Sequence, residues 1–230
     1  MKTRSFLLSV ALFAAVPAFA QQFFLTETYT FNVGSTAGDI PDGGSSSFSQ
    51  LVSASQIVHL TEVQVSLDLK GNPAAAGFAS DMFVSLNRGL GTQTAVLLNQ
   101  VGVTGSDPVG FGYGGWNVVF KDSAANGDVH LGQPTAPALT LTGSWQPDGR
   151  LSPSGSARSA LLSIFNGAAA NSTWYLHVAD LSNGATMTLD SWTLSFTGTT
   201  ATPVPEPEHF AALVGASLLG FALLRRFGRR

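Results

Sequence analysis

The feature that most constrains the fold is the strict alternation of polar and apolar residues in "TEVQVSLDLK", from Thr61 to Lys70. In an extended strand successive side chains point to opposite faces, so a period of two collects the apolar side chains on one face. The segment is therefore predicted to be a β-strand with one buried and one solvated face. Its apolar positions are Val63, Val65, Leu67 and Leu69, and its polar positions are Glu62, Gln64, Ser66, Asp68 and Lys70.

Comparable runs recur along the chain and are separated by turn-forming clusters such as "GNPAAAG", "NRGLG" and "LSNGA". The further predicted strands are residues 23–32, 81–87, 94–100, 116–122, 173–180 and 185–198. Short strands with hardly any helical period favour an all-β domain over residues 21–202. We expect an antiparallel, jelly-roll-like β-sandwich of two sheets rather than a barrel.

The alternation also predicts which side chains form the core, and it places His177 on the opposite face of its strand. The side chains expected to be buried are Val63, Val65, Leu67, Trp174, Leu176, Val178, Trp192 and Leu194. Trp116 also lies in a strand-like run and is expected in the core.

Composition narrows the classes of partner and of chemistry. The chain has 230 residues, of which 11% are charged, and no cysteine. The absence of cysteine excludes disulfides, thiolate nucleophiles and cysteine-ligated zinc. Residues 21–202 hold five basic and twelve acidic residues, a formal charge of −7. Because phosphates are bound by clustered Lys and Arg, we expect no nucleic-acid partner.

The first twenty residues, "MKTRSFLLSVALFAAVPAFA", have the pattern of a signal peptide. A basic start precedes an apolar run from Phe6 to Ala15, and Ala18 and Ala20 have the A-x-A spacing that signal peptidase recognises. We therefore predict export, with a signal peptide at 1–20 cleaved after Ala20. A first core helix is the alternative, but the apolar run has no polar face.

Residues 203–230 combine three features in a fixed order: a Pro205-Glu206-Pro207 motif, an uncharged segment at 210–224, and the basic residues Arg225 and Arg226. At 1.5 Å per residue the uncharged segment spans roughly 22 Å, less than the ~30 Å of a hydrocarbon core. The arginines would stop the chain in the inner membrane with this end in the cytoplasm. A single short transmembrane helix is predicted at 210–224.

The order of these features resembles the PEP-CTERM sorting signal of Gram-negative bacteria that make extracellular polysaccharide. In that family the membrane enzyme exosortase recognises the tail and cuts near the Pro-Glu-Pro. The resemblance implies a protein that is held transiently in the inner membrane and then passed to the cell surface, outer envelope or extracellular matrix. A permanent anchor is the alternative.

From about residue 56 to 199 the chain also resembles the P domain, or homo B domain, of subtilisin-like proprotein convertases. The resembling stretches are "TEVQVSLDL", "DMFVSLNRGLGTQTAVLL", "LLSIFNGAAANSTWYLHVAD" and "TLDSWTLSF". Asn87-Arg88 departs from the family's Ser-Pro, and Asn171-Ser172-Thr173 stands before Trp174 where a Gly is usual. The resemblance implies a jelly-roll sandwich of about eight strands.

Signals of catalysis are weak, and we expect a protein that is not an enzyme. No Gly-x-Ser-x-Gly is present. His59 and His177 lie in strand-like runs, and His130 in "GDVHLGQP" is a loop histidine without a second histidine at metal-ligand spacing. A pair of carboxylates for glycoside hydrolysis is not visible in the sequence, because only the fold brings such residues together.

Calcium is the one cofactor for which the sequence offers candidate ligands. The stretch "DSAANGD" contains Asp122, Asn126 and Asp128, and "ADLSNG" contains Asp180 and Asn183. These hard oxygen donors suit calcium, and related P domains often hold it, but the EF-hand pattern is absent. The same residue types also stabilise turns by bonding their own backbone, which is the alternative.

Two aromatic residues, Phe111 and Tyr113 in "VGFGYGGW", flank glycines in a predicted loop. Exposed rings bordered by polar groups stack on sugars, so this loop is a candidate carbohydrate contact. Rings that pack under the sandwich are the alternative.

Three function hypotheses follow. The leading one is a non-catalytic surface or matrix protein sorted by exosortase. The second is a carbohydrate-binding or adhesion module that acts on exopolysaccharide. The third is an accessory P-type domain linked to secreted proteolysis.

Overall fold

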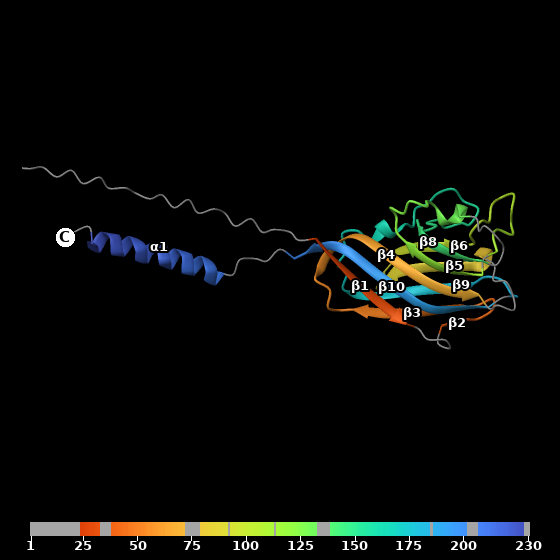
Figure 1. Cartoon of the computed structure of the whole chain (residues 1–230), viewed down its shortest axis with the longest axis horizontal. Helices are drawn as coiled ribbons and strands as arrows, with labels where there is room; N and C mark the ends of the chain where they lie inside the picture. Colours follow the sequence, from red (N-terminus) through yellow and green to blue (C-terminus); the bar gives the residue numbers. More distant parts are fainter. Residues whose placement is uncertain are drawn as a thin grey trace, which may run out of the picture. The chain divides into compact units, whose positions relative to one another are not determined.

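The computed structural model describes residues 24–32, 38–71, 79–91, 93–112, 114–132, 139–184, 186–201 and 207–227. The chain divides into two units, of which Phe23–Ala201 is a β-sandwich and the other contains helix α1 (Pro207–Phe227) (Figure 1). The predicted signal peptide at 1–20 lies outside the described residues.

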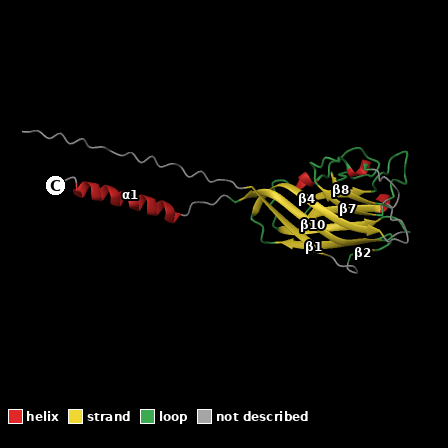
Figure 2. Ribbon diagram, in the orientation of Figure 1, coloured by secondary structure: helices red, strands yellow, loops and turns green. Residues whose placement is uncertain are grey.

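The larger sheet of the sandwich has six strands, and two long strands form its middle. The path across it is β1 (Phe24–Asn32), β10 (Met187–Thr200), β4 (Ile57–Gly71), β7 (Gly115–Phe120) and β8 (Thr140–Trp145), and β2 (Asp39–Ile40) also pairs with β10. Figure 2 shows these strands as one twisted layer.

The smaller sheet has four strands and supplies the other wall of the core. Its order is β3 (Ser45–Val52), β9 (Ser172–Asp180), β5 (Met82–Arg88) and β6 (Thr94–Asn99). The described helical segments of the sandwich are the short 3₁₀ turns η1 (Ala79–Asp81), η2 (Val129–Leu131) and η3 (Leu162–Phe165). The prediction of a two-sheet, nearly helix-free sandwich is therefore confirmed.

Two features of the sheets differ from the prediction. The pairing of β7 with β8 is parallel, so the larger sheet is mixed rather than purely antiparallel. β7 ends at Phe120 and β8 begins at Thr140. The connection between them is long enough for the chain to return to the other end of the sheet, so β8 can run in the same direction as β7. Strands β2, β3 and β8 also form where the sequence predicts none.

The predicted core faces are confirmed at every position. All eight side chains expected in the core are at most 2% exposed. His177 is half-buried and its Nδ1 lies 3.0 Å from the hydroxyl of Ser47 on the neighbouring strand, so the register of β9 is as predicted.

An aromatic cluster joins the two sheets at the centre of the core. The Trp174 ring on β9 contacts Phe165 of η3 edge-on, with ring centroids 5.1 Å apart. It also contacts Phe196 of β10 at 5.0 Å. Its indole Nε1 donates to the carbonyl of Ala170 at 3.0 Å, so the buried polar end has a partner.

Replacing Trp174 by alanine should lower the free energy of unfolding by about 3–5 kcal/mol, because a fully buried ring leaves a cavity between the sheets. Urea denaturation of the protein measures this. The neighbouring Tyr175 lies half-buried on the opposite face, and Tyr175→Ala should cost at most about 1 kcal/mol. Equal losses for the two variants would contradict the assignment of the faces.

Helix α1 contains the segment predicted at 210–224 and begins with Pro207, a residue suited to the first helical turn. Among the described residues, no helix is both long enough and apolar enough to cross a membrane. The predicted membrane span is therefore not confirmed.

Candidate functional site

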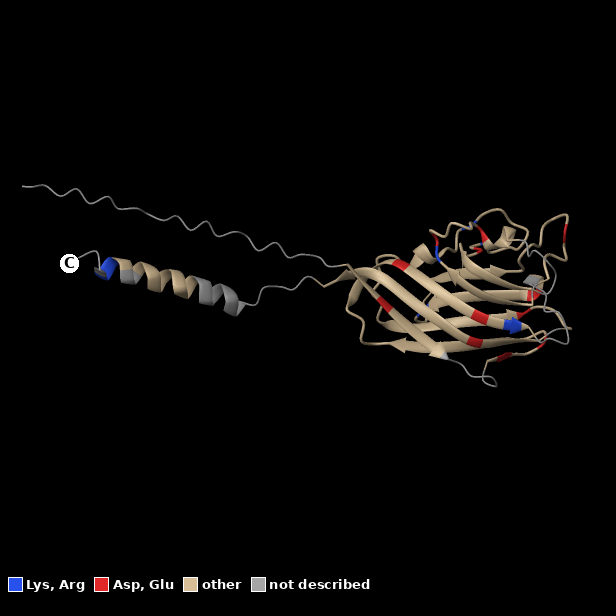
Figure 3. Ribbon diagram, in the orientation of Figure 1, with Lys and Arg blue, Asp and Glu red and all other residues tan. Residues whose placement is uncertain are grey.

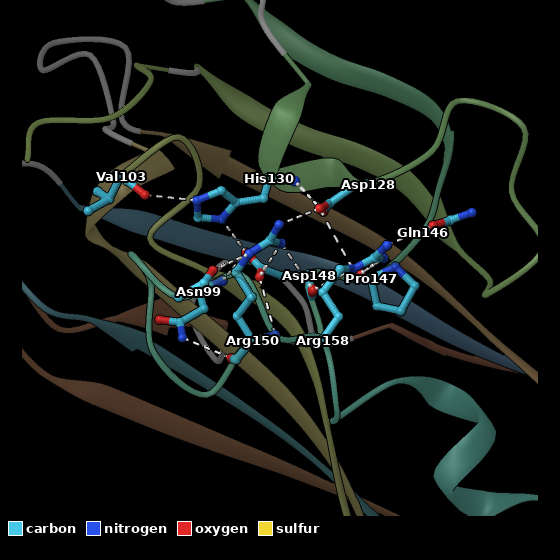
Figure 4. A network of polar contacts seen from close by, with 10 residues as sticks. Asn99, Val103, Asp128, His130, Gln146, Pro147, Asp148, Arg150 and Arg158 are labelled. Carbon is cyan, nitrogen blue, oxygen red and sulfur yellow. Dashed lines mark hydrogen bonds and ion pairs between the residues drawn. The ribbon is translucent and has the colours of Figure 1, made fainter. Parts of the chain in front are cut away.

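A network of polar and charged side chains, most of them buried, lies where the end of β6 meets the loops that follow β7 and β8. Figure 4 shows its members pointing toward one another from separate segments of the chain. They are Asn99, Asp128, His130, Asp148, Arg150 and Arg158.

Asp148 is the centre of the network and is 0% exposed. Its Oδ2 accepts hydrogen bonds from the ring Nδ1 of His130 at 2.7 Å and from the backbone N–H of Asn99 at 3.3 Å. Its Oδ1 accepts from Nη1 of Arg150 at 3.1 Å. A carboxylate can be buried in this way because two cationic partners and a backbone donor replace its hydration.

His130 is 3% exposed and both of its ring nitrogens face acceptors. Besides the Asp148 contact at Nδ1, its Nε2 lies 2.9 Å from the carbonyl oxygen of Val103. Two acceptors require two N–H donors, which only the protonated imidazole provides. Burial by itself disfavours that charged form, but the hydrogen bonds to Asp148 and Val103 outweigh it and raise the pKa of His130 above its usual value.

The two arginines are the other cationic members of the network. Nη2 of Arg150 donates to Oδ2 of Asp128 at 2.6 Å, and its Nε donates to the carbonyl of Gly155 at 2.9 Å. Arg158 binds carbonyl oxygens through Nε to Asp148 at 3.0 Å and through Nη2 to Pro147 at 2.6 Å. The network therefore joins three loop segments into one rigid unit.

The His130–Asp148 pair has the chemistry of a catalytic dyad but not its geometry. In a serine hydrolase the second ring nitrogen receives the proton of a nucleophilic hydroxyl. Here that nitrogen contacts the carbonyl of Val103, and none of the described hydrogen bonds of His130 involves a Ser or Thr hydroxyl. The arrangement can hold loops together.

The candidate calcium ligands of the first loop bind different partners. The carboxylate of Asp122 accepts from the backbone N–H groups of Leu162 and Ser163, at 3.1 and 2.7 Å, and so holds η3. Asp128 instead accepts from the N–H of His130 at 3.0 Å and from Arg150. The amide of Asn126 lies beside Gly143 in β8.

The second candidate calcium loop contains Asp180, which is 3% exposed, and Asn183, which is exposed. Burial, and after it the negative charges of Asp81 and Asp42, raise the pKa of the Asp180 carboxyl, although the N–H of Ser182 donates to it. In the part of the chain that the structure describes, no three His, Asp or Glu side chains are placed to hold a metal ion. Calcium binding stays a prediction.

The candidate sugar contact at Phe111 is not an exposed ring. Phe111 is partly buried and packs against the core. Gly102 allows this: its φ is +85°, and a Cβ there would lie 2.6 Å from the ring. The Phe111 ring thus packs partly against the core, and a sugar contact at this loop stays a prediction. Tyr113 lies outside the described residues.

Ala18, Ala20, Pro205 and Glu206 lie outside the described residues, and Pro207 begins α1. Arg225 and Arg226 are exposed in the last turn of α1, where cations suit the helix dipole.

Sequence reasoning singled out His130 as a loop histidine but found no partner for it. The signal that could have revealed the network is the scarcity of basic residues. Of the five between residues 21 and 202, Arg150 and Arg158 lie in one Gly- and Pro-containing loop that also holds Asp148. A charged cluster inside a loop of a weakly charged chain indicates a tertiary ion-pair network.

Comparisons with known proteins give the following result. No family model and no curated protein matches the chain. Among solved structures, a complex of the Aeromonas sobria serine protease with the chaperone ORF2 matches with 19% identity and a TM-score of 0.44, covering 77% of this chain and 27% of that one. The Aeromonas sobria serine protease alone matches with 18% identity and a TM-score of 0.42, covering 76% and 27%. The chain thus spans about a quarter of the length of each matched chain.

Replacing Asp148 by asparagine should lower the free energy of unfolding by about 3–5 kcal/mol, because His130 and Arg150 lose a buried counter-charge. Urea denaturation measures the loss. Asp190→Asn is the control: Asp190 pairs with Lys70 at the surface, and such pairs contribute little. An Asp148→Asn variant as stable as the control would show that the network does not stabilise the fold.

Stability should also depend on pH through His130. Its pKa is higher in the folded state than the unfolded value of about 6.5, so its contribution is fully present below about pH 6.5 and is lost as pH rises through the folded-state pKa. Urea midpoints measured between about pH 6 and pH 9 should fall in the wild type, and less so in His130→Gln. If His130→Gln follows pH as the wild type does, His130 is not the titrating group.

Proposed function

We propose that the chain is a non-catalytic β-sandwich protein that is exported and sorted to the cell surface or extracellular matrix. The observation that carries the non-catalytic part is the saturation of the buried ion-pair network. Every described nitrogen of the His130 ring and of the Arg150 guanidinium already has a protein acceptor. Catalytic groups, in contrast, need a free position for the reacting atoms.

His59 and His177, the other two histidines of the sandwich, each have a hydrogen-bonding contact at Nδ1. His59 Nδ1 lies 3.2 Å from the carbonyl of Gly167, and His177 contacts Ser47 and the edge of the Phe83 ring. The charged side chains are sparse over the sandwich (Figure 3). This distribution supports a structural or binding role.

The sorting part of the proposal is supported by the tail. Pro207 opens α1 and two arginines occupy its last turn, so a helix follows the Pro-Glu-Pro directly. Prolines at 203, 205 and 207 fix φ and favour an extended segment before it. An extended segment next to a helix gives a processing enzyme such as exosortase an accessible substrate at little ordering cost.

The carbohydrate-binding alternative gains no support from Phe111, whose partly buried ring lies beside Gly102. The accessory P-type alternative rests on the resemblance alone. Neither is favoured by a specific contact among the described residues.

Replacement of Pro205-Glu206-Pro207 by three alanines tests the sorting proposal. Export and folding should be unchanged, because the motif lies outside the sandwich, but the full-length protein should stay with the membrane fraction. In the wild type, mass spectrometry of the extracellular protein should show a C-terminus near the motif. A C-terminal peptide that still ends in Phe227-Gly228-Arg229-Arg230 would overturn the proposal.

A further inference from the structure

Five strands lie at the four borders of the two sheets: β1, the two-residue strand β2 and β8 in the larger sheet, and β3 and β6 in the smaller one. A border strand has a row of backbone N–H and C=O groups that can pair with a strand of another molecule. Folded proteins commonly block such edges with covering loops, kinks, inward-pointing charges or very short strands. Three of these four borders are blocked in this way.

The edge of β6 is covered by the loop that carries the ion-pair network. The N–H of Val96 donates to the carbonyl of Ala160 at 2.8 Å, and the N–H of Gly149 donates to Val96 at 2.9 Å. The N–H of Asp148 donates to Leu97 at 3.0 Å. No further strand can add there without displacing this loop.

The two borders of the larger sheet are blocked by local chemistry. In β8, Gly143 has a φ of +97°, which kinks the strand, and the indole Nε1 of Trp145 donates to the carbonyl of Thr142 at 2.9 Å. In β1, the Glu27 side chain is half-buried on the same side as Leu25, and its Oε1 accepts from the N–H of Gln56 at 3.0 Å. An inward-pointing charge on an edge strand opposes pairing with a second strand.

Strand β3 has none of these devices. It pairs with β9 over eight consecutive residues, from Ser45–Ala179 to Val52–Ser172, without a bulge. No charged residue and no proline occurs between residues 43 and 61. Among the described residues, the backbone of β3 has no hydrogen bond apart from its pairing with β9 and a contact of 3.4 Å from its own Gln50 side chain to Leu51. Figure 1 shows β3 along the border of the sandwich.

We propose that β3 is a self-association edge, and that it pairs antiparallel with β3 of a second copy of this chain. The two four-stranded sheets then form one continuous sheet about a two-fold axis. An isologous contact requires a surface that fits itself, and an uncharged strand meets its own copy without like-charge repulsion. A two-fold pair also closes the open border of both molecules, whereas a foreign peptide would leave its own far edge unpaired.

The alternation of the strand fixes which registers are allowed. Directly opposite residues of an antiparallel pair point to the same face, so the sum of their numbers must be even here. The register centred on Phe48 places Phe48 opposite its own copy on the core side. It places exposed Ser47 opposite Ser49 of the second copy on the solvent side. Small hydroxyl side chains allow this close approach.

A charge placed on the edge tests the proposal. The purified full chain should sediment as a dimer, and Ser49→Lys, an exposed position on β3, should make it monomeric. Thr28→Lys is the matched control, because Thr28 is an exposed hydroxyl residue on the blocked border strand β1, and this variant should remain dimeric. A wild type that is monomeric up to its solubility limit, or a Ser49→Lys variant that dimerises like the wild type, would overturn the proposal.

A cross-linking experiment keeps the test independent of how Ser49→Lys folds. The chain has no cysteine, so introduced thiols are the only ones present. After oxidation, an equal mixture of Ser47→Cys and Ser49→Cys chains should form disulfide-linked dimers, because opposite Cα atoms lie within the ~4.4–6.8 Å that a disulfide spans. Each variant alone should form far fewer. Absence of cross-linking in the mixture would overturn the register centred on Phe48. Neither experiment depends on export or sorting, so their failure leaves the proposed function untouched.

Discussion

The antiparallel pairing of β4 with β10 is the interaction on which the rest of the structure depends. These are the two longest strands, with 15 and 14 residues, and they pair from Gly71–Met187 to Ile57–Thr200. β10 carries β1 and β2 on its other side, and β4 carries β7. Their inward side chains, Leu67 and Trp192 among them, form one wall of the core. β7 pairs with β4, and β8 pairs with β7. The β4–β10 pair therefore also positions the loops after β7 and β8 that contribute to the ion-pair network.

The strands that can be predicted from the sequence are those with one buried face and one face turned toward solvent. β4, β9 and β10 alternate cleanly for this reason. β3 gives no such signal, because serines occupy both of its faces: Ser46 points inward and Ser47 outward. β8 contains Gly143 and exposes much of its length, so its pattern is equally weak. The parallel pairing of β8 depends on the path of the preceding loop, which local pattern does not encode.

The ion-pair network shows why a buried polar site is harder to predict than a strand. His130 lies 18 residues from Asp148 and 27 from Val103, so its two partners meet it only through the tertiary fold. Asp122 and Asp128 show the converse. They lie in one turn and look like a shared ligand set, yet one carboxylate binds the start of η3 and the other binds Arg150. The direction of each side chain, set by the turn, decides its role.

The pairing of β1 with β10 has a consequence for how the chain folds. Phe24 lies opposite Thr199, so the first and last strands of the sandwich are neighbours. Bringing residues 24 and 199 together costs chain entropy, and only the contacts of the finished sheet offset this cost. Contacts between residues this distant in sequence are typical of slow folding. A chain that emerges from the ribosome with its N-terminus first cannot complete the larger sheet until residue 200 is free. Until then the first strand has no partner in the larger sheet, because β1 pairs with β10 alone among the described strands.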